Sequence, residues 1–275
     1  MAEPYYMTPE ELLRVQEIET ELVQEVDRIC RKCGIHYNMI GGTMLGAIRH
    51  KGYIPWDDDA DIAMLRKEYE KFREACKTEL NSEKYYFQDI KGSDGYRWGY
   101  GKLRKKGTKF VRYGQEFMPY EQGIFIDLMP LDNVPDNKIL RRIHFFSCFL
   151  LRKFLWAGVG YKTEKNKGLK LLYSIMHLVP LPVLVKWYEF LGNVSSYYKT
   201  ELVRNLTLRV PKGSFGFKRE WYLKQRRYQF GPLFLTGAKD YDAYLTHKYG
   251  NYMEIPPEDE RKHLVISELK FGDES

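Results

Sequence analysis

Four aspartates, Asp57, Asp58, Asp59 and Asp61, lie within five positions of the chain. If residues 59–64 form a β-strand, the side chains of Asp59 and Asp61 point to the same face of it. Two neighbouring carboxylates repel and raise each other's pKa unless a divalent cation lies between them. Ligands that are all oxygen favour a hard ion, so we expect Mg²⁺ or Mn²⁺ at this pair. Asp57 is expected to add an outer contact to the metal.

A pair of glycines, Gly41 and Gly42, precedes these aspartates. They lie between an apolar run that ends at Ile40 and a short helix predicted over residues 43–50. Glycine allows a sharp turn and a close approach to a ligand, and the N-terminus of a helix offers free N–H groups to an anion. We therefore expect Gly41, Gly42 and Thr43 to cradle a phosphate. A phosphate cradle beside a metal-binding aspartate pair indicates transfer at phosphorus.

A third carboxylate, Asp127, interrupts the apolar stretch Gly-Ile-Phe-Ile-Asp-Leu-Met-Pro at residues 123–130. Such a stretch is typical of a buried strand. A buried carboxylate without a partner is costly, so Asp127 should be paired or should bind metal. The alternative is a core aspartate that accepts a hydrogen bond from a backbone N–H.

Basic and aromatic residues alternate over residues 96–104, which resemble a strand. The alternation would place Arg97 and Lys102 near a diphosphate, and a sheet edge with exposed basic residues explains it equally well. Trp98 or Tyr100 would instead face a quaternary ammonium through a cation–π contact, if these aromatic side chains do more than pack.

The segment at residues 42–62, Gly-Thr-Met-Leu-Gly-Ala-Ile-Arg-His-Lys-Gly-Tyr-Ile-Pro-Trp-Asp-Asp-Asp-Ala-Asp-Ile, resembles the signature of the LicD family. These phosphotransferases have a fold of the nucleotidyltransferase type and are related to fukutin and the fukutin-related protein. Residues 241–257, with their Tyr-Gly-Asn-Tyr-Met and Pro-Pro, also resemble the C-terminal part of LicD members. Arg261 and His263 follow at the positions of a basic residue and a histidine, where phosphate contact is the expected role.

The resemblance implies an α+β fold that forms one domain over residues 1–275. Its nucleotidyltransferase-like core, a mixed sheet, is expected at residues 34–135. Additional helices and a C-terminal segment are expected at residues 136–275.

The resemblance also implies roles for individual side chains. A later strand of such folds supplies a third carboxylate, so Asp127 would join Asp59 and Asp61 as a catalytic residue and metal ligand. Asp127 is also a candidate to accept the proton of the attacking hydroxyl. The substrate's phosphates would be bound by Arg49, Lys102 and Arg104 beside the glycines and Thr43 named above.

The expected reaction is the metal-dependent transfer of a phospho-alcohol, above all phosphocholine from CDP-choline, to a hydroxyl of a cell-surface glycan. The acceptor would be a teichoic acid, capsule or lipopolysaccharide precursor carried on a lipid. Two alternatives stay open. One is a nucleotidyltransferase attacked at the α-phosphate of its donor, and the other is a membrane-associated scaffold without activity.

The net charge of +7 favours anionic partners. No recognition helix, zinc finger or RNA-binding motif accompanies it, so nucleic acid is not expected as a partner. The N-terminus lacks the basic and apolar regions of a signal peptide, and the apolar run at residues 171–185 is too short to span a bilayer. These features predict a cytoplasmic protein.

Residues 141–199 combine apolar and aromatic clusters with basic residues, which indicates helices with unusually apolar faces. Such helices either pack on the core or contact the inner face of an anionic membrane. Membrane contact would use basic residues together with inserted aromatic ones, namely Arg152, Lys153, Lys165, Lys167 and Lys170 with Phe154 or Trp156.

A long amphipathic helix is predicted to begin at Thr8, as its N-cap, and to stop at Gly34. A second amphipathic helix is predicted with Leu65, Tyr69, Phe72, Cys76 and Leu80 on one side. Cys30 and Cys33 form a lone Cys-x-x-Cys at the end of the first helix. With no second pair to complete a zinc site, packing residues are the preferred interpretation.

Overall fold

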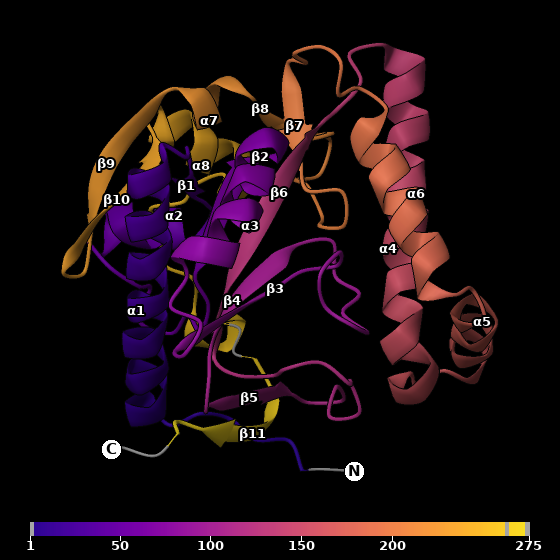
Figure 1. Ribbon diagram of the computed structural model, residues 1–275, viewed down its shortest axis with the longest axis horizontal. Coiled ribbons are helices and arrows are strands. Elements are labelled where there is room, and N and C mark those ends of the chain that lie inside the picture. The colour runs from indigo at the N-terminus through magenta and orange to yellow at the C-terminus, as the bar shows by residue number, and fades with distance from the viewer. Residues whose placement is uncertain (1–2, 262–263, 273–275) are drawn as a thin grey trace.

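The computed structural model describes residues 3–261 and 264–272, in which helices and strands mix in an α+β fold (Figure 1). The strands are β1 (Asn38–Met39), β2 (Asp61–Leu65), β3 (Tyr85–Gln88), β4 (Gly101–Lys105), β5 (Lys109–Arg112), β6 (Phe125–Asn133), β7 (Leu202–Arg204), β8 (Phe217–Lys218), β9 (Gln225–Phe230), β10 (Leu233–Ala238) and β11 (Ile266–Lys270). The α-helices are α1 (Pro9–Cys33), α2 (Gly41–Arg49), α3 (Arg66–Glu79), α4 (Lys138–Thr163), α5 (Lys167–His177), α6 (Leu181–Asn193), α7 (Glu220–Leu223) and α8 (Tyr241–Tyr249), and a 3₁₀ turn covers Glu258–Glu260.

The central sheet has the strand order β1-β2-β6-β4-β3, with β7 and β8 added at the far end of β6. Strands β2 and β6 are parallel, and the other neighbours are antiparallel. All strands of the main path lie within residues 34–135, which were predicted as the core. Because β2 and β6 run in the same direction, residues at their N-terminal ends lie side by side.

Helix α1 begins and ends where the sequence predicted. Thr8 and Glu11 form the capping box, with Thr8 Oγ1 accepting the N–H of Glu11 at 3.2 Å and Glu11 Oε2 accepting the N–H of Thr8 at 2.8 Å. Gly34 ends the helix in the left-handed region, with φ of 64°. Cys30 is buried, as expected of a packing residue, whereas Cys33 is exposed, so the packing interpretation was wrong for Cys33.

Two elements near the aspartates differ from the prediction. Helix α2 begins at Gly41 rather than residue 43, because Ile40 is extended and acts as the N-cap. Strand β2 begins at Asp61 rather than residue 59. Its pairing with β6 starts at Asp61 and its pairing with β1 starts at Ile62, so Asp59 is left in the preceding loop.

Helices α4, α5 and α6 form a layer on one side of the sheet, with α5 lying furthest out, while α1 lies on the other side (Figure 1). Both α4 and α6 bury one face, and their buried side chains include Leu151, Leu155, Leu184 and Tyr188. Packing, one of the two expectations for this region, is therefore confirmed for these faces. Phe154 was expected to insert into a membrane, but its ring packs against Trp187 with a centroid distance of 5.8 Å.

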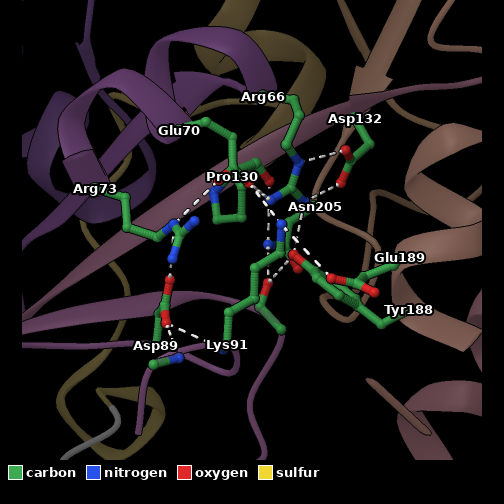
Figure 2. A network of polar contacts seen from close by, with 12 residues as sticks. Arg66, Glu70, Arg73, Asp89, Lys91, Pro130, Asp132, Tyr188, Glu189 and Asn205 are labelled. Atoms are coloured by element: carbon green, nitrogen blue, oxygen red, sulfur yellow. Dashed lines mark hydrogen bonds and ion pairs between the residues drawn. The ribbon is translucent and has the colours of Figure 1, made fainter. Parts of the chain in front are cut away.

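A network of ion pairs joins this helical layer to the core (Figure 2). Arg66, at the start of α3, binds both carboxylate oxygens of Asp132 on β6 at 2.8 and 2.7 Å. The same guanidinium donates to the hydroxyl of Tyr188 on α6 at 2.6 Å. A lysine continues the network, with Lys91 Nζ 3.0 Å from Glu70 and 3.8 Å from Glu189. The network thus fixes α6 against α3 and β6.

Among residues 3–261 and 264–272, no single helix is long and apolar enough to cross a membrane. Helices α5 and α6 meet that test of length and composition only as a pair, and they are bent by 85° at the break between them.

Candidate active site

The three predicted carboxylates meet at the start of the parallel pair β2–β6. Asp61, the first residue of β2, is in register with Asp127 on β6. Asp59 lies two residues earlier, in a loop that is held against β6 because the N–H of Asp127 donates to the carbonyl of Ala60 at 2.9 Å. The three side chains thus lie in one region of the structure, although Asp59 reaches it from a loop and not from the strand.

The pKa values of these aspartates show how crowded the group is. Burial, together with Asp59 and Asp127, raises the pKa of Asp61 well above its usual value. Burial and the charges of Asp127 and Asp58 raise the pKa of Asp59 to about 6. Burial and the charges of Asp59 and Asp58 raise that of Asp57 to about 8. Several carboxylates that share one partly buried site require a nearby positive charge.

Lys102 supplies part of that charge from inside the protein. Its Nζ forms a buried ion pair with Asp127 and lies 3.2 Å from the centre of the Phe125 ring. Burial lowers the pKa of Lys102 to about 7, although the charge of Asp127 acts in the opposite direction. Lys102 was predicted to bind the substrate's phosphates. In the structure its ammonium group instead binds Asp127. Asp127 was expected either to be paired or to bind metal, and here it is paired.

The glycines at the start of α2 pass close to the aspartates. A Cβ atom on Gly42 would lie 2.3 Å from Asp57 Oδ2, and one on Gly41 would lie 3.0 Å from Asp61 Oδ2. Gly41 also has a φ of 58°, which favours glycine. The backbone therefore favours glycine at Gly41, whereas at Gly42 a side chain would require only the Asp57 carboxylate to move.

The donors and acceptors of this turn are partly occupied by the protein itself. The N–H of Gly41 donates to the hydroxyl of Tyr244 on α8 at 2.9 Å. Thr43 Oγ1 accepts the N–H of Asp61 at 2.7 Å. Thr43 was predicted to cradle a phosphate, but its hydroxyl instead fixes the backbone at the start of β2.

Helix α8 adds a cation that sequence reasoning missed. A Cβ atom built on Gly41 would lie 2.9 Å from Lys248 Nζ and 3.0 Å from Asp61 Oδ2. The ammonium group and the carboxylate are therefore both close to Gly41. Burial lowers the pKa of Lys248, and the charges of Asp61, Asp59 and Asp57 oppose that shift. Tyr244 and Lys248 are four residues apart and so share one face of α8. That spacing was visible in the sequence, whereas the contact with Gly41 was not.

A cleft of about 460 Å³ opens above this group, a size typical of ligand sites. Three of the aspartates and three basic side chains line it: Asp57, Asp59, Asp61, Arg49, Lys248 and Arg261. The guanidinium of Arg261 lies 4.3 Å from the centre of the Trp56 ring. Arg261 thus lies in the cleft, where phosphate contact was expected of it, and His263 lies outside the described residues.

Of the other predicted basic residues, only Arg49 reaches this cleft. Its Nη1 donates to the carbonyls of Tyr252 and Glu254 at 2.9 and 3.0 Å. Arg104 is buried in the sheet and donates to Gln88 and to the carbonyl of Gly123. Its predicted role at the phosphates is therefore wrong, because internal acceptors in the sheet use its donors.

Arg97 is likewise occupied, because its Nε donates to the carbonyl of Leu155 on α4 at 2.6 Å. The predicted approach of Arg97 to a diphosphate was wrong for this reason.

A second, smaller pocket of about 200 Å³ lies between the sheet and α4. The indole rings of Trp98 and Trp156 line it with a centroid distance of 6.1 Å, and Tyr100, just before β4, also lines it. Two guanidinium groups, those of Arg112 and Arg152, share the lining. These positive charges disfavour a quaternary ammonium here, which was the alternative expected for Trp98 or Tyr100.

The carboxylate group suits a hard divalent ion by its donor chemistry. Within the described ranges, no three Asp, Glu, His or Cys side chains already stand close enough together to hold a metal. The raised pKa values of Asp59 and Asp61 nevertheless mark like charges that a cation would stabilise. Mg²⁺ commonly uses one or two carboxylates together with substrate phosphates, so Asp59 and Asp61 fit this requirement without Asp127.

Comparisons with known proteins indicate one family for this chain. Residues 34–147 match the family model described as LicD/FKTN/FKRP, nucleotidyltransferase domain. The chain is 30% identical to the lipopolysaccharide cholinephosphotransferase LicD of Haemophilus influenzae in an alignment 261 positions long, which covers 87% of this chain and 90% of that protein. An uncharacterized protein of Rickettsia prowazekii is 40% identical over 48 residues, 18% of each chain. The chain therefore belongs to the LicD family.

Proposed function

We propose that this protein transfers phosphocholine from CDP-choline to a hydroxyl of a cell-surface glycan. The observation that carries the proposal is the group of Asp59, Asp61 and Asp127 beside a cleft lined by basic side chains. The full-length similarity to a lipopolysaccharide cholinephosphotransferase supports the choice of phosphocholine. In this reaction the glycan oxygen attacks the phosphorus that carries choline, and CMP leaves.

The donor would occupy the larger cleft. Lys248 and Arg261 both line it and carry N–H groups able to bind diphosphate oxygens. Arg49 adds a further positive charge at the same wall. Gly42 lines the same cleft at the N-terminus of α2, where backbone N–H groups favour an anion.

Asp59 and Asp61 would hold the Mg²⁺ or Mn²⁺ ion. When bound, such an ion neutralises charge on the diphosphate and on the departing CMP. Asp127 keeps its ion pair with Lys102 and lies on the strand next to Asp61. From there Asp127 would accept the proton of the attacking hydroxyl, as the sequence led us to expect.

The acceptor would enter through the smaller pocket. Arg112 lines this pocket, and although burial acts to lower its pKa, the charges of Tyr100, Asp127 and Asp59 raise it, so it interacts with the carboxylates of the active site as well. The flat faces of Trp98 and Trp156 suit the C–H surface of a sugar ring. Arg152 would bind an anionic substituent of the glycan.

The test is incubation with a panel of CDP-alcohols and a glycan acceptor, with CMP release and product mass as readouts. CDP-choline should release CMP and add phosphocholine to the glycan. Release of pyrophosphate from a nucleoside triphosphate would instead identify a nucleotidyltransferase. An absence of turnover with every donor, while the protein still binds the glycan, would favour the scaffold.

Activity should depend on an added divalent ion, with Mg²⁺ or Mn²⁺ effective, because oxygen ligands favour these ions. The same ions should raise the melting temperature of the protein, since they relieve repulsion among ionised aspartates. Turnover and thermal unfolding are to be measured after dialysis against a chelator and again after each metal is restored. Full activity in excess chelator would exclude the metal site.

Replacement of Lys248 by methionine should lower kcat/KM for the CDP-alcohol by about 10- to 100-fold, the usual loss for a charge-assisted hydrogen bond. Steady-state kinetics with varied donor measures the effect. Lys239→Met, at an exposed lysine just before α8, is the matched control and should leave kcat/KM unchanged. Equal kinetics for the two variants would remove Lys248 from the donor site.

A further inference from the structure

The turn between α5 and α6 presents an uncharged apolar surface that no other part of the structure covers. Residues 171–185, here called the elbow, contain no Asp, Glu, Lys or Arg, and Lys170 and Lys186 flank them directly. The elbow includes most of α5 and the start of α6, which are bent by 85° relative to each other. In Figure 1 this end of the helical layer lies away from the sheet.

The apolar side chains of the elbow point outward to an unusual degree. Leu178 is 79% exposed, Leu171 64% and Ile175 57%. In α5, Tyr173 is the buried residue. Sixteen of the twenty-five exposed large apolar side chains in the described ranges lie between residues 139 and 198, less than a quarter of the chain. Apolar exposure on this scale indicates an interaction surface.

The net positive charge of the protein arises in the same layer, because this layer has few acidic residues. Residues 138–199 contain 11 Lys or Arg and two Asp or Glu, whereas the rest of the chain contains 33 and 35. The net charge of +7 is therefore due to these residues alone, since the remainder is slightly acidic. A partner that covers the elbow must be apolar within and anionic at its rim.

We propose that the elbow inserts into one leaflet of an anionic lipid bilayer. Helix α5, with 11 residues, is about 16 Å long, shorter than the roughly 30 Å apolar thickness of a bilayer. The elbow therefore lies in the interface and does not cross it. Lys170 and Lys186 would remain at the level of the lipid headgroups, where long basic side chains favour anionic lipid.

A second copy of this chain is a poorer occupant of the same surface. Pairing two helical layers would bring two strongly positive surfaces together, which is electrostatically unfavourable. An anionic bilayer instead buries the apolar side chains of the elbow in its acyl chains and attracts the surrounding basic residues to its headgroups.

Membrane docking would also suit the proposed acceptor. Helix α4 lines the small aromatic pocket through Arg152, Leu155 and Trp156, so this pocket borders the layer that carries the elbow. A glycan carried on a lipid would then meet the protein at the bilayer surface. The docking inference itself does not depend on the reaction, because lipid binding can be measured without donor or acceptor.

Co-sedimentation of the full chain with vesicles tests the inference. Two vesicle types are compared, phosphatidylcholine alone and phosphatidylcholine mixed with phosphatidylglycerol, at low and high salt. The first elbow variant is Leu178→Asp/Val183→Asp. Its two side chains are 79% and 52% exposed, so the variant should still fold. Leu13→Asp/Leu223→Asp makes the same change at side chains 60% and 57% exposed elsewhere. Lys170→Glu/Lys186→Glu is matched by Lys212→Glu/Lys239→Glu.

Wild-type protein should bind the anionic vesicles at low salt and detach as salt rises, because screening weakens the attraction. Each elbow variant should reduce the partition coefficient by at least about tenfold, and both control variants should bind like the wild type. Three results would overturn the proposal. The first is wild-type protein that stays in solution with anionic vesicles, and the second is elbow and control variants that bind vesicles alike. The third is a dimer, detected by sedimentation velocity, that only the elbow variants dissociate.

Discussion

We expect Asp61→Asn to lower kcat by at least about 100-fold, with Asp59→Asn similar. Asp61 lies beside both Asp59 and Asp127 and lines the donor cleft, so its carboxylate would contact the metal and the developing charge. Interactions that strengthen in the transition state affect kcat more than substrate binding, and loss of one typically costs two or more orders of magnitude. CMP release under saturating donor measures the effect. Asp94→Asn, at an exposed aspartate, is the matched control.

The stability of the same variant separates lost chemistry from lost folding. A carboxyl group whose pKa is raised in the folded protein favours folding only while it is protonated, and this contribution is lost as the pH rises through the raised pKa. The pKa of Asp61 is raised well above normal, chiefly by burial, so its ionised form opposes folding at neutral pH. Metal-free Asp61→Asn should therefore melt no lower than the metal-free wild type. It should also lose the stabilisation by Mg²⁺. Wild-type kcat in a folded Asp61→Asn protein would contradict the active-site assignment.

Much of the carboxylate group could be predicted because its signals are local. The close spacing of Asp59 and Asp61 and the single acid in the apolar run around Asp127 both stand out against their neighbours. Their proximity depends on the parallel pairing of β2 with β6, whereas the family resemblance indicated only that a later strand supplies a third carboxylate. The exact start of β2 was missed, because it depends on where the long-range pairing with β6 begins, at Asp61 and Asp127.

The basic residues were harder to assign for a physical reason. Lys102 and Arg104 alternate along β4, and alternation indicates a common face without saying what that face contacts. Inside a sheet, buried cations must be satisfied by protein groups, and these two are bound by Asp127 and by Gln88 with Gly123. Lys248 comes from a helix far along the chain, so no local pattern could place it beside Gly41.

One guanidinium contributes to the attachment of the helical layer, beside its apolar packing. Arg66 holds the carboxylate of Asp132, whose side chain is fully buried, and reaches Tyr188 on α6 (Figure 2). The hydroxyl of Tyr188 in turn donates to the carbonyl of Gly99 at 3.2 Å, which lies beside the aromatic residues of the smaller pocket. The proposed acceptor site and the membrane-facing elbow therefore share this support.

Arg66→Met should lower the free energy of unfolding by about 3–5 kcal/mol, because it leaves the buried carboxylate of Asp132 without its charge partner. Denaturant unfolding of wild-type and variant proteins measures the loss. The double variant Arg66→Met/Asp132→Leu should recover much of it, since removing both charges removes the unpaired one. Lys77→Met is the matched control on the same helix: its ion pair with Glu74 is exposed, with 63% and 56% of the two side chains accessible. Loss of that pair should change stability by no more than about 1 kcal/mol. If Arg66→Met were as stable as Lys77→Met, the helical layer would be held by its apolar packing alone.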